Sequence, residues 1–359
     1  MSLWLCPLPP FARFLWFQFD LKNRRTFLKR CSYPSISLAD LYIGAQVTIY
    51  SRQLRILSYG DAFTSSKLSV TKSKSLALVK PGGYESWGKL LTELAQGGYK
   101  LGRMKSILMT PQQAQQFYGD KQPSQRAHEL ARGPVLALEI VGAGAQATLL
   151  KATQRGEFRD LYVAESERTA EAELDFLFSN PSLRTTATFQ NCTLGLIKPH
   201  AVQAGHAGAI IDAILRDGFD ISALELFNLD KTSAEEFLEV YKGVIPEYFN
   251  LVEQLCSGSV IALELRAPSA RLEHDGMSIV NAFRNFTGPS DPEIARHIRP
   301  RSLRAVFGQN KIKNAIHCTD LEEDGVLESQ FFFEILQQHQ AQQPTSLSGT
   351  QQFQQTQRR

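Results

Sequence analysis

The stretch Thr193-Leu194-Gly195-Leu196-Ile197-Lys198-Pro199 decides the fold, because the chain carries a second version of it. Ser75-Leu76-Ala77-Leu78-Val79-Lys80-Pro81, 118 residues earlier, has the same pattern of small or apolar residues followed by Lys-Pro. Two further pairs of segments match in the same order, 97–101 with 217–221 and 133–139 with 258–264. Three matches in one order predict two copies of a single domain.

Each copy has the pattern of a strand, a helix, a strand, two helices and a strand. In the second copy we expect strands at about 193–197, 219–228 and 260–265, helices at about 207–216 and 277–285, a further helix starting at Thr232 or Ser233, and a closing helical stretch at 321–336. This order is typical of a ferredoxin-like α/β sandwich with an antiparallel sheet. The expected fold class is therefore α/β (α+β), with two such domains at residues 72–180 and 188–337.

The segments outside the two copies have other compositions. Residues 1–68 predict a small β-rich module, with strand character at 41–44, 47–50 and 54–57 and a turn signal at 59–61. A basic run at 20–31 is either a solvated edge that blocks strand pairing or a dock for an acidic protein surface. The polar segment 65–74 predicts a linker, and the glutamine-rich segment 338–359 predicts a disordered tail.

The bulk composition excludes several classes of protein. The 39 basic and 36 acidic residues leave a formal charge of +3, too small to indicate nucleic acid as the main partner, although the basic run at 22–30 keeps that reading open as a weak alternative. No apolar run approaches the roughly 18 residues of a membrane span, and the N-terminal segment does not have the pattern of a signal peptide. The five cysteines are isolated, which fits a reducing compartment and offers no zinc site.

The stretch Lys311-Ile312-Lys313-Asn314-Ala315-Ile316-His317-Cys318-Thr319-Asp320 contains the best candidate nucleophile. A histidine is largely neutral near neutral pH, and a neutral imidazole nitrogen attacks a phosphate without the repulsion that an anion meets. Such a site also needs an acid that orients the ring and cations that hold the phosphates.

The second copy resembles a nucleoside diphosphate kinase over nearly all of residues 190–336. The matching segments are Leu196-Ile197-Lys198-Pro199-His200-Ala201, Val240-Tyr241-Lys242-Gly243, Cys256-Ser257-Gly258, Arg284, Ser302-Leu303-Arg304-Ala305-Val306-Phe307-Gly308 and 314–320. The resemblance implies ping-pong transfer of a γ-phosphate from a nucleoside triphosphate to His317 and then to a diphosphate. It also implies that Glu328 orients the histidine, that Mg²⁺ arrives with ATP or another nucleotide without direct protein ligands, and that the nucleotide is bound by Lys198, Tyr241, Arg284, Arg304 and Asn314.

Considered one at a time, these residues could also have purely structural roles. His317 could be a core histidine, Lys198 a solvated charge at a strand end, and Glu328 a residue on a solvated helix face. Arg304 could pair with an acid, and Tyr241 could serve packing alone. The loop at 286–292 is shorter than is usual in the family, and its Thr287 is out of register with the threonine that contacts phosphate there.

The first copy resembles the family less well at the site. Lys80 and Tyr118 are kept, but only about thirty residues separate the third strand from the closing segment 171–178. Aligning Glu173 with Glu328 places Tyr162 at the position of His317, and Arg159 at that of Asn314. We therefore expect Lys80, Tyr118 and Tyr162 to be degenerate counterparts of the site, and the copy to act as a scaffold.

The order of the modules resembles ciliary members of the family that begin with a module called DM10. The likeness is carried by residues 25–30, 41–44 and 47–52; the module's first strands are expected to be missing, with 1–19 as an altered beginning. The resemblance implies a microtubule inner protein of the ciliary or flagellar axoneme, bound to tubulin and other inner proteins, cytoskeletal and cytoplasmic, with no membrane or nucleic-acid partner. The alternative is a soluble nucleoside diphosphate kinase with accessory domains and no structural role.

Overall fold

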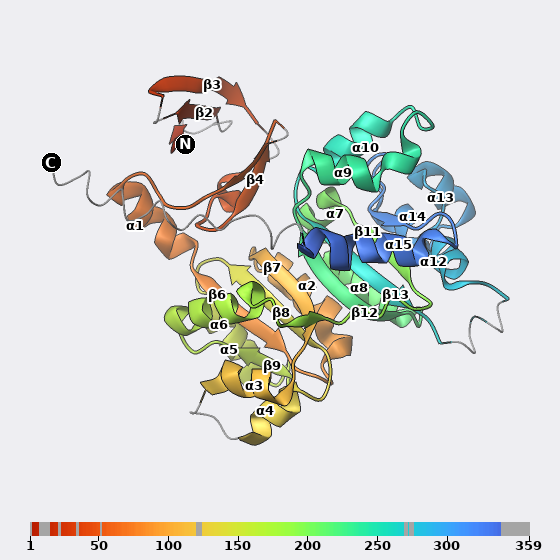
Figure 1. Ribbon diagram of the computed structural model, residues 1–359, viewed down its shortest axis with the longest axis horizontal. Helices are drawn as coiled ribbons and strands as arrows, with labels where there is room; N and C mark the ends of the chain where they lie inside the picture. The colour runs from red at the N-terminus through yellow and green to blue at the C-terminus, as the bar shows by residue number, and fades with distance from the viewer. Residues whose placement is uncertain are drawn as a thin grey trace.

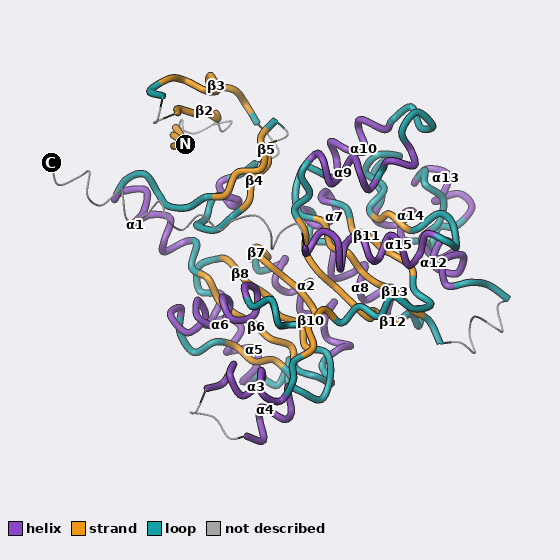
Figure 2. Tube along the Cα trace, in the orientation of Figure 1, coloured by secondary structure: helices purple, strands orange, loops and turns teal. Residues whose placement is uncertain are grey.

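The computed structural model describes residues 2–6, 15–20, 23–33, 36–50, 52–119, 124–268, 272 and 276–338. The predicted tail lies outside these residues except for Gln338. Within the described part, no helix is both long and apolar enough to cross a membrane. Figures 1 and 2 show three regions, an N-terminal β-rich part and two α/β parts that lie side by side.

The second copy is an antiparallel sheet covered by helices. Its strands, in the order β14-β11-β13-β12, are β11 (Thr193–Ile197), β12 (Asp220–Phe227), β13 (Val260–Arg266) and β14 (Ile316–Cys318). Its helices are α7 (Pro199–Gln203), α8 (Ala207–Arg216), α9 (Lys231–Phe237), α10 (Tyr248–Leu255), α12 (Ile279–Thr287), α13 (Pro292–Ile298), α14 (Leu303–Phe307) and α15 (Asp324–Gln330), which continues as a π-helical turn at Phe331–Ile335. The predicted strands and the helices at 207–216 and 277–285 are confirmed within two residues. The predicted helix that follows is also found, but α9 begins one residue before Thr232, because the carboxylate of Asp230 caps it by accepting from the Ser233 N–H.

The first copy repeats this topology with fewer helices. Its strands, in the order β7-β8-β6-β9, are β6 (Lys74–Val79), β7 (Lys100–Leu108), β8 (Val135–Val141) and β9 (Leu161–Val163). Its helices are α2 (Trp87–Gln96), α3 (Pro111–Tyr118), α4 (Ser124–Leu130), α5 (Ala145–Gln154) and α6 (Glu167–Ser179). In the ladders, Leu78 lies opposite Tyr162 and Leu196 lies opposite His317. Tyr162 and His317 therefore hold equivalent places in the two copies.

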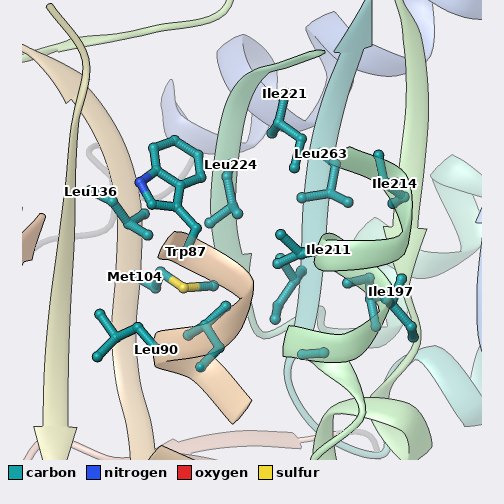
Figure 3. Packing of buried hydrophobic residues seen from close by; sticks show 14 of the residues in the cluster. Trp87, Leu90, Met104, Leu136, Ile197, Ile211, Ile214, Ile221, Leu224 and Leu263 are labelled. Atoms are coloured by element: carbon teal, nitrogen blue, oxygen red, sulfur yellow. The ribbon is translucent and has the colours of Figure 1, made fainter. Parts of the chain in front are cut away.

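The two copies share one continuous sheet. The equivalent strands β7 and β12 pair antiparallel, with Lys105 opposite Glu225, and the short strand β10 (Arg184–Thr185) also pairs with β7. Side chains of both copies form one apolar cluster at this seam, where Trp87 and Leu90 of α2 lie near Ile211 of α8 (Figure 3). The two copies therefore pack together through the same elements of each copy, strand β7 against β12 and helix α2 against α8.

Helices α2 and α8 cross closely because each contributes a glycine. A Cβ atom on Gly208 would collide with the Gly88 carbonyl oxygen and with Thr92, and one on Gly88 would collide with Asp212. Glycine at these two positions lets the helix backbones approach. The crossing thus depends on the absence of two side chains.

The N-terminal part contains two small sheets and a helix. Its elements are β1 (Ser2–Cys6), β2 (Leu15–Asp20), β3 (Arg25–Ser32), β4 (Gln46–Ile49), β5 (Arg52–Arg55) and α1 (Ala62–Thr71). The segment predicted as an altered beginning, 1–19, contains β1 and most of β2. The predicted strand at 41–44 is wrong, because this segment is a turn closed by Gly44 at φ +92°. The predicted linker at 65–74 is also wrong, since most of it belongs to α1.

Contacts with both copies hold the N-terminal part in place. Tyr42 and Ala45 pack against Val141 of β8. The Gln53 side-chain amide donates to the Asn228 carbonyl at 2.6 Å, just beyond β12 of the second copy. The N-terminal part therefore docks where the two copies meet.

Candidate functional site

His317 lies on the short strand β14 with its ring held from one side. Its Nε2 atom is 2.9 Å from Oε2 of Glu328, on helix α15. The Thr319 hydroxyl donates to the same carboxylate oxygen at 2.9 Å, and the ring of Phe237 packs edge-on at 5.1 Å between centroids. No hydrogen bond of the His317 Nδ1 atom is found among the described residues. Glu328 thus fixes the ring and leaves Nδ1 available.

The alternation of side chains along β14 places His317 on this face. Ile316 and Cys318 belong to the apolar cluster on one side of the sheet, so His317 points to the other side, where Phe237 lies. Thr319 is anchored in turn, because its hydroxyl accepts from the Leu194 N–H at 3.1 Å. Sequence reasoning gave no role to Thr319 or Phe237, whose positions depend on tertiary packing.

Two buried cations lie next to β14. Lys198, directly after β11, donates from Nζ to the Ile312 carbonyl at 3.2 Å. Arg304 donates from Nε to the Ile316 carbonyl at 3.1 Å and from Nη1 to the Gly288 carbonyl at 2.9 Å. Burial, with the nearby charge of Arg304, lowers the pKa of Lys198 to about 7.

The electrostatic consequence is an excess of positive charge. Lys198 is 6% exposed and Arg304 is 9% exposed, and in the part of the chain that the structure describes neither is bonded to a carboxylate. The expectation that Arg304 could pair with an acid therefore finds no support in its contacts. Buried cations without counter-ions are costly, so the cluster favours an anionic ligand.

Asp320 joins two further predicted residues to the cluster. The Tyr241 hydroxyl donates to Oδ2 of Asp320 at 2.5 Å. Arg284 donates to the Asp320 carbonyl at 2.7 Å, and its Nη2 lies 3.6 Å from Oδ1. Burial and the hydrogen bond to Asp320 raise the pKa of Tyr241, so its phenol stays protonated. Asp320, quoted in the motif but given no role from sequence, is the link between Tyr241 and Arg284.

Asn314 lies at the edge of the cluster with half of its amide unused. Its Nδ2 donates to the Ser290 carbonyl at 3.0 Å, while Oδ1 is buried and no residue that the structure describes donates to it. A buried acceptor of this kind is suited to a ligand donor. Thr287, the last residue of α12, is fully buried, and its hydroxyl does not face solvent. The exposed hydroxyl residue of this loop is Ser290.

The first copy keeps the scaffold of the site and little of its chemistry. Tyr162 donates to Oε1 of Glu173 at 2.5 Å, and the ring of Tyr118 packs edge-on at 5.9 Å. Burial, the hydrogen bond to Glu173 and its charge raise the pKa of Tyr162, which opposes formation of a nucleophilic phenolate. Lys80 is half-buried and Arg159 is exposed. Only α5 connects β8 to β9, whereas α12, α13 and α14 lie between β13 and β14 and carry the arginines.

Known proteins are similar to this chain in sequence. The family model "Nucleoside diphosphate kinase" matches residues 191–337. The mouse protein named nucleoside diphosphate kinase homolog 7 is 39% identical over 345 residues, which cover 88% of this chain and 85% of the mouse protein. The chain belongs to the nucleoside diphosphate kinase family. The rat nucleoside diphosphate kinase homolog 7 is 38% identical with the same coverage.

Within the nucleoside diphosphate kinase family, some relatives match only part of this chain over nearly all of their own length. The crystal structure of the nucleoside diphosphate kinase of Aquifex aeolicus is 37% identical, with a TM-score of 0.36, and the match covers 40% of this chain and 96% of that one. The family predicted from the motifs is confirmed by the family model and by the mouse and rat relatives. The roles of the individual residues stay predictions.

Proposed function

We propose that residues 188–337 form a nucleoside diphosphate kinase domain that transfers a γ-phosphate through a phosphohistidine at His317. The observation that carries this proposal is the contact of His317 Nε2 with Glu328 beside a cluster of buried cations. An oriented imidazole with one free nitrogen is a nucleophile, and uncompensated cations are a phosphate site.

The reaction needs two displacements at phosphorus. The lone pair on Nδ1 of His317 attacks the γ-phosphorus, the bond from that phosphorus to the β,γ-bridging oxygen breaks, and the diphosphate leaves. The proton on Nε2, donated to Glu328, stabilises the positive charge that develops on the ring. A terminal oxygen of a second diphosphate then attacks the phosphorus, the P–N bond breaks, and the histidine is regenerated.

The remaining site residues bind and orient the nucleotide in this proposal. Lys198, Arg284 and Arg304 balance the charge on the phosphate oxygens, as phosphoryl transfer requires. Tyr241 is positioned beside the histidine through Asp320. The unpartnered Oδ1 of Asn314 accepts a hydrogen bond from the nucleotide.

Mg²⁺ would enter this site with the nucleotide. Among the described residues, no three histidine, cysteine, aspartate or glutamate side chains gather closely enough to hold a metal ion. In this proposal the phosphate oxygens of the nucleotide would hold the ion. When bound, the ion would offset phosphate charge together with Lys198 and Arg304.

Labelling with ATP tests the phosphohistidine directly. The full chain incubated with γ-labelled ATP and Mg²⁺ is expected to form an acid-labile, base-stable phosphoprotein, and addition of a diphosphate is expected to remove the label. His317→Gln should abolish the label, while the matched change Tyr162→Phe in the first copy should leave it unchanged. Absence of label in the wild-type chain would overturn the proposal.

We further propose that the protein is a structural component of the ciliary or flagellar axoneme, a microtubule inner protein bound to tubulin. Supporting this role, the first copy keeps its sheet, its core and its seam with the second copy although Tyr162 replaces the nucleophile. In this proposal the chain consists of a DM10-like module at 1–68, a degenerate kinase-like domain at 72–180 and the kinase domain at 188–337. The alternative remains a soluble kinase with accessory domains.

Axoneme fractionation separates the two roles. A protein inside the microtubule lumen is expected to stay with axonemes through detergent and moderate salt, and to be released only when the doublets are dissolved. Release by mild salt would exclude the lumenal role and favour the soluble enzyme, independently of the labelling result.

A further inference from the structure

One residue of the site loop, Ala315, is held from both sides by the turn that follows β11. The Lys198 N–H donates to the Ala315 carbonyl at 2.8 Å, and the Ala315 N–H donates to Nε2 of His200 at 3.1 Å. Ala315 is fully buried and has a left-handed backbone, with φ +72°. A non-glycine residue is strained in this region and persists there only when its surroundings hold it.

The ring of His200 is set to accept this bond. Because Nε2 accepts from Ala315, the ring proton must be on Nδ1. Nδ1 lies 3.1 Å from the amide nitrogen of Gln254, and among the described residues the amide oxygen has no partner. Exchanging these two amide atoms, which are told apart only by their hydrogen bonds, makes the oxygen the acceptor of the Nδ1 proton. Burial, followed by the charges of Lys198, Lys313 and His206, lowers the pKa of His200 to about 4, so the ring is neutral at physiological pH.

The first copy provides an internal comparison. Its Lys80 N–H donates to the Asp160 carbonyl at 2.7 Å, just as Lys198 donates to Ala315. The position of His200 is taken by Gly82, which has no side chain, and Asp160 does not have a left-handed backbone. The copy without the nucleophilic histidine thus lacks both the side-chain bond and the strained residue.

We propose that His200 is a positioning residue that holds Ala315 in its left-handed turn and thereby aims Asn314 into the nucleotide site. This inference rests on the proposed kinase function for the role of Asn314. His317 is held separately by the β11–β14 ladder and by Glu328. Loss of the His200 bond therefore affects Asn314 before it affects the nucleophile.

The first experiment compares two substitutions in the full chain. His200→Leu removes the acceptor, and His200→Gln keeps an amide oxygen near the position of Nε2. We expect His200→Leu to weaken ADP binding and raise KM about fivefold to tenfold, the equivalent of one lost hydrogen bond, with kcat changed much less. His200→Gln should restore most of the affinity. Equal ADP affinity in all three proteins, or equal losses in kcat and in affinity, would overturn the proposal.

A second substitution tests the strain itself. Glycine adopts the left-handed region without strain, so Ala315→Gly in the His200→Leu background is expected to recover part of the lost affinity. No recovery, in a protein whose circular dichroism matches the wild type, would mean that His200 does not act through Ala315. This arm also covers the case in which His200→Leu alone folds poorly.

Nuclear magnetic resonance keeps this test separate from the proposed function. In the nucleotide-free wild type, the ¹⁵N signals of His200 should report the Nδ1–H tautomer, and the Ala315 amide should exchange slowly with solvent and become faster in His200→Leu. A protonated Nε2 would overturn the inference even in an active kinase. If the tautomer and the exchange rates are as expected but no phosphoenzyme forms, the His200–Ala315 hydrogen bond is supported and the kinase function is overturned.

Discussion

The 2.9 Å contact between His317 Nε2 and Glu328 Oε2 gives the two ring nitrogens different tasks. In the proposed mechanism the nitrogen that faces Glu328 carries the proton, which leaves the lone pair on Nδ1. Thr319 donates to the same carboxylate oxygen and restrains the glutamate. In the proposed mechanism the carboxylate thus orients the ring and balances its charge, and the phosphate is accepted on the opposite side of the ring.

The first prediction separates these tasks with Glu328→Gln. The amide keeps the shape of the side chain and removes its charge, so phosphoenzyme formation should slow by roughly 10- to 100-fold, as for other groups that orient a reacting histidine. Rapid-quench labelling measures the rate, and mass spectrometry with ³¹P resonance assigns the phosphate to Nδ1. The control Thr319→Ser, which keeps the hydroxyl, should be nearly wild type. Phosphate on Nε2 would contradict this division of tasks.

The second prediction concerns the proton on Lys198. Its folded-state pKa of about 7 lies below the ordinary value of 10.5, so at pH 8.5 the free protein holds it mainly neutral. A bound phosphate favours the ammonium form and raises this pKa, so binding should take up close to one proton and nucleotide affinity should fall as pH rises above about 7. The free energy of unfolding of the nucleotide-free protein changes in the opposite direction and rises with pH. The cost of burying the Lys198 ammonium is largest below pH 7 and disappears between pH 7 and 10.5.

Calorimetry measures the proton uptake. ADP titrations at pH 8.5 in two buffers of different ionisation enthalpy should give different apparent heats. The difference in heat divided by the difference in ionisation enthalpy is the number of protons taken up. Lys198→Arg is the matched control, since guanidinium stays charged across this range and should show no uptake. Equal heats in both buffers for the wild type would show that Lys198 is already charged in the free protein.

The third prediction is that Tyr162→His does not create a second phosphorylation site. The new ring would face Glu173 as His317 faces Glu328, but the first copy has no helices that correspond to α12 and α14, which carry Arg284 and Arg304. A nucleophile without the phosphate cations lacks the main source of transition-state stabilisation. The test is made in the His317→Gln background, where any label must come from the first copy. Label there would contradict the assignment of this copy as a scaffold.

Sequence patterns located the elements of each copy better than they located the contacts between distant parts. The strand at 193–197 was predicted to the residue, because the repeated apolar pattern and Lys-Pro mark both of its ends. The sequence does not predict helix α1, because its serine, threonine and lysine residues resemble a linker, although the Asp61 carboxylate caps it by accepting from the Thr64 N–H. The β7–β12 seam joins segments that no local pattern relates. The roles of Asp320 and His200 depend on tertiary contacts in the same way.

The fourth prediction tests whether the two copies depend on their helix crossing. Gly208→Ala would place a methyl group against the Gly88 carbonyl and Thr92, so α2 and α8 must move apart and loosen the apolar cluster that both copies share. We expect a loss of about 1–3 kcal/mol in the free energy of unfolding, the range of overpacking at a tight contact. Urea denaturation of the full chain measures it. Gly60→Ala is the matched control, because a Cβ there meets no atom within 4 Å and should change stability little. If the two substitutions cost the same, the copies do not rely on this crossing, and the shared sheet alone must hold them together.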